Sequence, residues 1–484
     1  MERDDFMTKV DGYYDVIIIG AGIAGATAAR ELSKYRLSIA VVEKEADVCF
    51  GATKGTHGII HCGIPGPGTP LRDRGELMGN LMMEGLCREL DVPFRRVGKL
   101  LVGFSKEEVN ILRDIEHNTR ENGVAGVELI QDRHRLKEME PNLSDDVVGA
   151  LYTPTTAVTS PWSLVIALME NARDNGVGLY LNARVTDVKK TPEDDFVVTT
   201  CAGALRASFV INAAGVYADK IAGMIGDRGF TIKGLRQQRI ILDERCNGVV
   251  RRLVRGLSGT SPTGNFVTPT VDGNIMVGCK VEEVADVEDV RTTREGLKEW
   301  VIPQYLKLIP GLAPENSIKP FAGLIPLAGD DYYIKSAPDS PRFVNLVLGA
   351  SGFTASPAMA RYLVEEVLPA AGLTLEHKRD FNPDRRDIPH FSELDNVERG
   401  KLISKNLLFG HIVCRCETVS EGEILEAIRR GAATRDGIKF RTRAGMGRCQ
   451  GNFCGHKVLE IMSRELGVPA EEVTQKGGGS EELL

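Results

Sequence analysis

The sequence predicts a mixed α/β (α+β) protein with a small helical domain at its C-terminus. Three observations support this prediction. An apolar run at residues 15–20 leads into a glycine-rich turn and a helix, which is the order of a parallel α/β unit. Residues 267–278 read as two strands joined by an Asp-Gly-Asn turn, which indicates an antiparallel hairpin. Clustered cysteines near the end of the chain indicate a small domain built around a metal centre.

The composition is that of an ordinary globular protein. The chain has 484 residues, of which 42% are hydrophobic and 26% charged. A formal net charge of −7 argues against nucleic acid as the main partner, because phosphate backbones need a basic face. The polar start lacks a secretory signal, and the apolar run at 16–29 is too short and glycine-rich to cross a membrane. Cysteines without disulfide spacing fit a reducing cytoplasm, and contact with the inner face of a membrane stays compatible with this.

The first α/β unit carries a dinucleotide-binding fingerprint. After the buried strand, Gly20 allows a tight turn, Gly22 lets a pyrophosphate approach the backbone, and Gly25 lets the helix pack on the strand. A second strand, residues 38–43, ends at Glu43, 18 positions after Gly25, where a carboxylate can accept a hydrogen bond from a ribose hydroxyl. The alternative is a glycine-rich turn without a ligand. On these grounds alone FAD and NAD are equally compatible with the fingerprint.

This N-terminal unit resembles the FAD-binding start of the D-amino-acid-oxidase-like flavoprotein family. Residues 210–215, 348–360 and 182–188 resemble three further segments of that family, and the likeness covers about residues 13–375. The resemblance implies a Rossmann-like FAD-binding domain with an inserted antiparallel-sheet substrate domain. It also implies a set of FAD contacts: Gly20, Gly22, Ile23, Ala24, Gly25, Glu43, Lys44, Thr53, Thr56, His57, Gly58, His61, Val185, Ala213, Ala214, Gly215, Gly323, Gly349, Ser351, Gly352, Phe353 and Thr354.

Two histidines lie in the glycine-rich segment 51–64, where the family places its flavin-facing loop. The I-H-x-G pattern at His61 resembles the glycerol-3-phosphate and L-2-hydroxyglutarate dehydrogenase branches. An alcohol donor loses its hydroxyl proton as its C–H hydride goes to flavin N5. A neutral imidazole is suited to accept that proton. His61 and His57 are therefore the catalytic candidates. The alternative is that both only contact the cofactor.

Residue 325 departs from the pattern of these branches. Their enzymes usually carry an arginine here that pairs with the substrate anion, whereas this chain has Ile325. Because an alkyl chain cannot replace a guanidinium, either another cation binds the substrate anion or the donor differs. The candidate cations are Lys54, Arg236, Arg239 and Lys335.

Four cysteines near the C-terminus form the pattern C-x-C, a long gap, then C-x-x-x-x-C: Cys414, Cys416, Cys449 and Cys454. Clustered thiolates suit an iron–sulfur cluster, and neither pair has the C-x-x-C spacing that zinc sites favour, although zinc stays an alternative. Ser420 and Glu423 predict a capping box at the start of a short helix. We expect the last helix to start at Cys454. The segment resembles the bacterioferritin-associated-ferredoxin-like [2Fe-2S] domain, found in anaerobic glycerol-3-phosphate dehydrogenases and in several amine and opine dehydrogenases.

Four basic residues near these cysteines are candidates to balance the negative charge of such a cluster. They are Lys439, Arg441, Arg443 and Arg448. The alternative is that they form a solvated basic face.

The predicted organisation has four parts. Residues 13–375 form the oxidoreductase, with FAD-binding segments at about 13–90, 146–225 and 320–375 and a substrate domain at about 91–145 and 226–319. A charged, proline-marked linker spans 376–410, the [2Fe-2S] domain 411–465, and a flexible tail 466–484.

Together these features predict a dehydrogenase that passes a hydride from its donor to FAD and exports the electrons through the cluster. The resemblance favours sn-glycerol 3-phosphate, a small anionic substrate, with an L-2-hydroxyacid (2-hydroxyglutarate-type) and an amine or imino acid as alternative donors. The expected acceptor is an NADH-linked flavoprotein subunit or a quinone. A chain that only transfers electrons, or one whose cluster has a regulatory role, is the alternative from another class.

Overall fold

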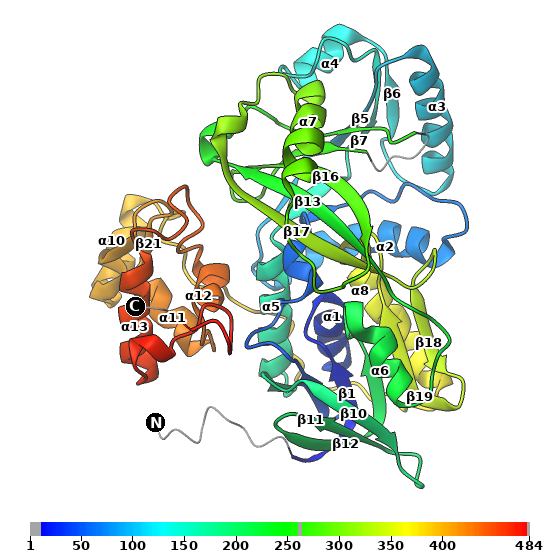
Figure 1. Cartoon of the computed structure of the whole chain (residues 1–484), viewed down its shortest axis with the longest axis vertical. Helices are drawn as coiled ribbons and strands as arrows, with labels where there is room; N and C mark the ends of the chain where they lie inside the picture. Colours follow the sequence, from blue (N-terminus) through cyan, green and yellow to red (C-terminus); the bar gives the residue numbers. More distant parts are fainter. Residues whose placement is uncertain (1–10, 260–263, 482–484) are drawn as a thin grey trace.

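Two large sheets carry most of the chain, and a small helical domain lies beside them (Figure 1). This computed structural model describes residues 11–259 and 264–481. We call the three parts the parallel-sheet domain, the antiparallel-sheet domain and the cysteine domain. In Figure 1 the antiparallel-sheet domain lies above the parallel-sheet domain, and the cysteine domain flanks both.

The parallel-sheet domain is organised around β1 (Tyr13–Ile19), which pairs in parallel with β2 (Ile39–Val42) and β12 (Gly203–Asn212). This sheet has eight strands. The others are β9 (Gly178–Tyr180), β10 (Val185–Lys190), β11 (Phe196–Thr200), β18 (Tyr333–Ala337) and β19 (Ser340–Val347).

Both faces of β1 are buried, as its unbroken apolar run predicts. Val16 and Ile18 pack in the core formed with three helices, and Ile17 and Ile19 pack in the core of the opposite face. The three helices are α1 (Ile23–Leu32), α5 (Pro161–Asp174) and α8 (Gly352–Tyr362). The opposite face is covered by α6 (Ala218–Met224) and by the β10–β11 hairpin.

The antiparallel-sheet domain also has eight strands, in the order β17-β13-β16-β15-β14-β5-β7-β6. Its central pair, β13 (Lys233–Leu242) and β16 (Ile275–Val284), is antiparallel, and β15 (Phe266–Pro269) with β16 forms the hairpin predicted at 267–278. The remaining strands are β5 (Lys99–Gly103), β6 (Glu128–Ile130), β7 (Gly149–Thr153), β14 (Leu253–Gly256) and β17 (Ser317–Leu327).

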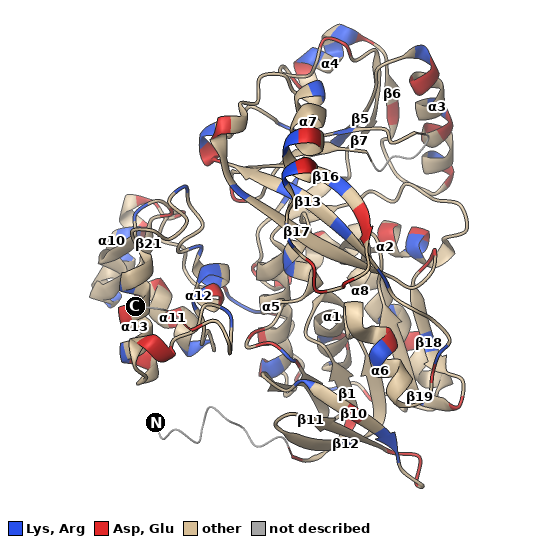
Figure 2. Cartoon of the chain, in the orientation of Figure 1, with Lys and Arg blue, Asp and Glu red and all other residues tan. Residues whose placement is uncertain are grey.

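Helices at the outer end of this sheet enclose its core. Figure 2 shows the charged residues that these outer helices carry: α3 (Lys106–Glu121), α4 (Arg133–Met139) and α7 (Ile302–Leu308). A long helix, α2 (Pro70–Glu89), packs against α8, and a three-stranded sheet joins β3 (Ile59–Ile60), β8 (Ala157–Thr159) and β4 (Phe94–Arg96).

Two strands belong to a different domain from the one that the sequence predicts. β7 and β17 were assigned by sequence to the FAD-binding segments 146–225 and 320–375, but both belong to the antiparallel sheet. β7 pairs with β5 from Gly103↔Gly149 to Lys99↔Thr153, and β17 pairs with β13 along nearly its whole length. The chain crosses between the domains after these strands, and no local motif marks the crossing.

The cysteine domain consists of short helices around one core. They are α10 (Asn396–Lys405), α11 (Glu421–Arg429), α12 (Arg435–Thr442) and α13 (Gly455–Leu466), with a two-stranded sheet of β20 (Ile412–Cys414) and β21 (Val419–Ser420). The Ser420–Glu423 capping box and the start of α13 at Cys454 are confirmed.

The segments predicted as linker and tail both make hydrogen bonds. Asn171 of α5 and Asn175 at its C-cap donate to the carbonyl of Asn382. The Arg435 amide donates to the Thr474 carbonyl, and the Asp436 amide to that of Gln475. Residues 482–484 of the predicted tail lie outside the described residues. Within 11–259 and 264–481, no helix is long and apolar enough to cross a membrane.

A close backbone crossing joins the two large domains. The 3-10 turn η2 (Ala52–Gly55) meets β17 so tightly that a Cβ at Gly323 would lie 2.5 Å from the Gly55 carbonyl oxygen.

We expect Gly323→Ala to lower the free energy of unfolding by about 1–3 kcal/mol, because backbone on both sides must shift. Thermal unfolding measures this effect. Gly311→Ala is the matched control, since nothing lies within 4 Å of its added Cβ. Equal stability of the two variants would contradict the tight crossing.

Candidate functional site

A long cavity of about 470 Å³ runs from the glycine-rich turn of the parallel-sheet domain to the underside of the antiparallel sheet. We call it the central cavity. It is lined by all but two of the predicted cofactor contacts. The exceptions are Gly25, which packs against the strand, and Gly58. Residues that the sequence did not single out also line it: Arg184, Tyr217, Lys220, Gln237, Glu288, Pro326 and Leu348.

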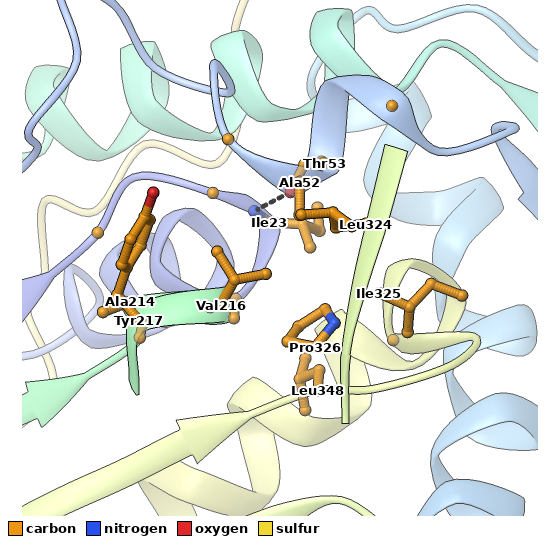
Figure 3. Close-up of a pocket in the computed structure, with 18 of the residues that line it drawn as sticks. Ile23, Ala52, Thr53, Ala214, Val216, Tyr217, Leu324, Ile325, Pro326 and Leu348 are labelled. Atoms are coloured by element: carbon orange, nitrogen blue, oxygen red, sulfur yellow. Dashed lines mark hydrogen bonds between the residues drawn. The ribbon is translucent and has the colours of Figure 1, made fainter. Parts of the chain in front are cut away.

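The glycines of the first turn have the roles expected from their spacing. Gly20 has a φ of +104°, and a Cβ at Gly25 would lie 1.9 Å from the Gly20 carbonyl oxygen, so helix α1 can approach β1 only with glycine there. The Ile23 amide donates to the Thr53 hydroxyl at 3.1 Å (Figure 3). This bond ties the start of α1 to η2, so both segments hold the cavity wall.

Glu43 lies at the end of β2, in the cavity wall. Its Oε2 accepts from the Ala21 amide at 2.7 Å and its Oε1 from the Glu45 amide at 3.0 Å. Burial raises the pKa of this carboxyl, although both amides oppose the shift. The carboxylate is thus fixed beside the glycine-rich turn, with lone pairs left for a ligand hydroxyl.

The two predicted histidines lie together at the far end of the cavity, with ring centroids 5.2 Å apart. His57 Nδ1 accepts from the Ile59 amide at 3.1 Å, which leaves the proton of the neutral ring on Nε2. The pKa of each histidine is well below its usual value, first through burial and then through nearby cations. Both rings are therefore neutral at pH 7. The His61 main chain is held by Thr354, whose hydroxyl accepts from its amide at 3.0 Å, and by Asn80.

Three buried cations surround these histidines: Arg239 on β13, Arg255 on β14 and Lys99 on β5. Arg239 is 2% exposed, donates to the Gly55 carbonyl at 2.5 Å and has no hydrogen-bond partner for Nε within the described chain. Burial lowers its pKa to about 10. Arg255 Nε donates to the Gly264 carbonyl at 2.9 Å, and Lys99 Nζ lies 3.6 Å from the Cys62 sulfur.

The negative charge facing this cluster is small. Glu76 on α2 is buried and interacts with Lys99 and with Arg255, and its hydrogen-bond partner is Ser351 at the N-cap of α8. Burial raises the pKa of Glu76 to about 7, so this carboxyl carries only part of a charge at neutral pH. The histidine end of the cavity therefore has an excess of buried positive charge, which favours an anionic ligand.

The four predicted substrate cations have different surroundings, and only Arg239 lines the central cavity. Lys54 lines a second cavity, and Arg236 is ion-paired with Glu282 and Asp289. Lys335 lies on β18 with its ammonium over the Tyr333 ring. Ile325 does line the cavity, as an alkyl side chain. The sequence did not identify Lys99 and Arg255 as site residues. The one local signal for each is its position as a basic residue within an apolar strand.

The four C-terminal cysteines form two pairs. Cys414 hydrogen-bonds with Cys454, and the sulfurs of Cys416 and Cys449 are 3.6 Å apart. Backbone amides also point at the sulfurs, among them those of Gly445 and Glu417 toward Cys414 and of Gly451 toward Cys449. The hydrogen bond from Cys454, helped by these amides, lowers the pKa of Cys414 to about 6. In the described part of the chain, no three Cys, His, Asp or Glu side chains form a group that could hold one metal ion.

Two arginines of α12 and its C-cap fasten the cysteine domain to the other two parts. Arg441 forms a buried double ion pair with Asp47, at 2.5 and 2.9 Å. Arg443 pairs with Asp272 in the β15–β16 turn and with Glu417, next to Cys416, both at 2.8 Å. Sequence reasoning gave these arginines a role in balancing cluster charge. The structure pairs Arg441 with Asp47 and Arg443 with Asp272 across the domain junction, and Arg443 also with Glu417 inside the cysteine domain.

Comparisons with known proteins agree with this architecture. Residues 15–366 match the family of FAD dependent oxidoreductases (DAO), and residues 412–464 match the BFD-like [2Fe-2S] binding domain. The chain is 40% identical over 472 residues to the glycerol 3-phosphate dehydrogenase of Caloramator mitchellensis, covering 96% of this chain and 97% of the relative.

Two further relatives are more distant. One subunit of the anaerobic glycerol-3-phosphate dehydrogenase of Escherichia coli K12 is 25% identical over 502 residues, covering 93% of this chain and 88% of that protein. The FAD-bound structure of L-alpha-glycerophosphate oxidase from Mycoplasma pneumoniae is 24% identical, with a TM-score of 0.73, and covers 77% of this chain and 98% of that one. At this identity the structural likeness shows the fold alone.

The Asp47–Arg441 pair gives a test of domain docking. We expect Asp47→Ala to destabilise the protein by about 3–5 kcal/mol, because it leaves the buried Arg441 without its counter-charge. The double variant Asp47→Ala with Arg441→Met removes both charges and is expected to recover much of that loss. Thermal unfolding, with limited proteolysis in 376–410, measures both. A single variant as stable and as protease-resistant as the parent would contradict the docking role.

Proposed function

Because the chain belongs to the FAD dependent oxidoreductase family and carries a BFD-like [2Fe-2S] binding domain, we propose that it is a dehydrogenase of sn-glycerol 3-phosphate. The product is dihydroxyacetone phosphate. One observation carries this substrate: Arg239 lines the histidine end of the cavity, and two further buried cations, Arg255 and Lys99, act on the histidines there, with Glu76 as the facing carboxyl. The 40% identical relative named as a glycerol 3-phosphate dehydrogenase supports the same choice.

The family match confirms the fold class and the two cofactors predicted from the sequence. The central cavity fits FAD in its chemistry. A glycine-rich turn at the start of α1 suits the pyrophosphate, and the fixed Glu43 suits a ribose hydroxyl. At the other end, Gly323, Gly349 and Gly352 line the cavity, where glycine backbone can lie close to a planar ring. The four cysteines and the surrounding amides likewise suit an anionic iron–sulfur cluster.

When bound, the flavin accepts the hydride from C2 of the substrate and the cluster carries the two electrons away singly. The side chains of the cavity supply binding and proton transfer. Arg239 is suited to hold a phosphate dianion, because a guanidinium group forms charge-assisted hydrogen bonds with phosphate oxygens, and the buried Arg255 adds positive charge near this end of the cavity. This arrangement explains how the chain can bind its substrate with Ile325 in place of the usual arginine.

His61 is the better base for the C2 hydroxyl proton. His57 already uses Nδ1 to accept the Ile59 amide, and its Nε2 holds the proton, so neither nitrogen is free to take another. His61 is neutral, and among the described residues its ring makes no comparable hydrogen bond to a backbone group. The residue is held in place through its own backbone amide and carbonyl. Glu76, reached through Ser351 at the cavity wall, provides a group of pKa about 7 behind the site that can take up a proton.

The cysteine domain would hold the cluster and so provide the route to an electron acceptor. Phe453 lies directly before the cluster ligand Cys454 and is 75% exposed, and exposed aromatic residues are frequent anchors of protein interfaces. The Escherichia coli relative is named as one subunit of an anaerobic dehydrogenase, which supports assembly with other chains. We therefore propose a partner flavoprotein subunit that reaches NAD, or a quinone, as acceptor, and place the reaction in the cytoplasm or at the inner face of the membrane.

Anaerobic titration tests the donor. We expect glycerol 3-phosphate to bleach the flavin absorbance of the purified holoenzyme, and L-2-hydroxyglutarate to leave it oxidised. Arg255→Gln should lower kcat/KM for glycerol 3-phosphate by about a hundredfold, because it removes a buried charge partner of the phosphate. Arg251→Gln, on the exposed loop just before β14, is the control. Reduction by L-2-hydroxyglutarate alone, or an unaffected Arg255 variant, would overturn the assignment.

Substitution of His61 and substitution of His57 should slow flavin reduction to different extents. We expect His61→Asn to slow this step by about 10²–10⁴-fold, the usual contribution of a general base. His57→Asn should have a much smaller effect, because an amide oxygen can still accept from Ile59. Rapid-mixing absorbance without oxygen measures both variants. A larger loss in the His57 variant would contradict this division of roles.

A further inference from the structure

A second cavity, of about 280 Å³, lies where the three parts of the chain meet. We call it the junction cavity. Its walls come from the segment 54–57, from residues 158–162 at the end of β8 and the start of α5, from β13, β16 and β17, from the β15–β16 turn, and from α12 with the following loop to Gln450. Gly55, Thr56 and His57 line both cavities. Gln450 is the neighbour of the cluster ligand Cys449, so the junction cavity lies between the flavin site and the cluster.

Each of the three parts contributes one lysine to this cavity: Lys54 from η2, Lys319 from β17 and Lys439 from α12. The Lys54 ammonium lies over the Phe50 ring, and the Asp436 carboxylate acts on both Lys54 and Lys439. Lys319 and Lys439 are close enough for their ammonium groups to repel each other. Figure 2 shows basic residues on α12 beside α5. Two like charges at this distance are destabilising unless an anion lies between them.

The remaining charged groups of the cavity balance only part of this positive charge. Asp436 faces Lys54 and Lys439 as the one carboxylate near both, and Asp272 is ion-paired with Arg443. Burial, and then Lys319, lower the pKa of Lys439 to about 8, so this lysine is still mostly protonated at neutral pH. The cavity therefore has a net positive charge. Its walls also include the Trp162–Phe440 pair, with ring centroids 5.5 Å apart, which gives the site a fluorescent reporter.

We propose that the junction cavity binds a phosphate group, either inorganic phosphate or that of a small phosphate ester, between Lys54, Lys319 and Lys439. Phosphate suits the site better than a monoanion, because three lysines line one cavity and lysine binds phosphate as a point charge. Since each lysine belongs to a different part, an occupied site ties the cysteine domain to the flavin site. Occupancy then stabilises the docked arrangement by mass action. Phosphate binding here does not depend on which donor reduces the flavin.

Calorimetric titration of the holoenzyme with inorganic phosphate, at constant ionic strength set by chloride, tests the proposal. We expect saturable binding that Lys439→Gln and Lys319→Gln each weaken by about tenfold, because each removes one charge-assisted hydrogen bond. The exposed Lys457→Gln, in the same domain, should bind like the parent. In a Trp300→Phe background, where Trp162 is the remaining tryptophan, phosphate should change the tryptophan emission.

The source of the phosphate group and the consequence of binding have separate readouts. Saturable binding of glycerol 3-phosphate alone to the oxidised enzyme, lost in Lys439→Gln while flavin reduction persists, would assign the site to a phosphate ester. Phosphate should also raise the unfolding temperature of the parent more than that of Lys439→Gln. Absence of saturable binding by both probes, or binding that neither lysine variant weakens, would overturn the proposal. Neither result bears on flavin bleaching, which tests the proposed function.

Discussion

The excess of buried positive charge at the histidine end of the central cavity is the constraint on which the site depends. Arg239, Arg255 and Lys99 come from three strands of the antiparallel sheet, and the packing of that sheet removes them from water. Burying cations without matched carboxylates is unfavourable, so the fold keeps this arrangement at the expense of stability. A dianionic substrate supplies the missing charge. Burial, and then the nearby cations, hold both histidines neutral, which is the state a general base requires.

The arrangement of the three domains holds the reacting groups between rigid elements of the fold. The parallel sheet ends at the glycine-rich turn, and the antiparallel sheet covers the opposite end of the cavity. The two meet at the Gly55–Gly323 crossing, where side chains would not fit. The cysteine domain is then fixed by Arg441 and Arg443 to one residue from each large domain, Asp47 and Asp272. Electron export needs such a defined distance between the flavin site and the cluster.

Sequence reasoning succeeded where the signal is local. The glycine spacing, the Ser420–Glu423 capping box and the cysteine pattern each lie within one short segment, and each has a recognisable physical purpose. The loss of an arginine at Ile325 was also visible from the sequence, as was the need for another cation. Among the candidates, Arg239 lies in the cavity, whereas Lys335 lies outside it.

The remainder of the site depends on long-range packing that no local pattern encodes. Lys99, Arg255 and Glu76 come from β5, β14 and α2, which meet only after two sheets and a helix have assembled. A single charge in an apolar strand looks the same whether it faces solvent or a ligand. The partners of Arg441 and Arg443 lie hundreds of residues upstream or in another domain, so their ion pairs could not be read from charge alone. The boundaries at β7 and β17 were missed for the same reason.

The central claim is that one substrate molecule reduces the flavin and that its two electrons then leave through the cluster. Rapid mixing of the oxidised holoenzyme with glycerol 3-phosphate, without oxygen or acceptor, tests this most directly. Flavin absorbance should fall first, and the paramagnetic signal of a reduced [2Fe-2S] cluster should follow as flavin absorbance partly returns. A flavin that stays oxidised, or a bleached flavin beside a cluster that never becomes reduced, would contradict the account.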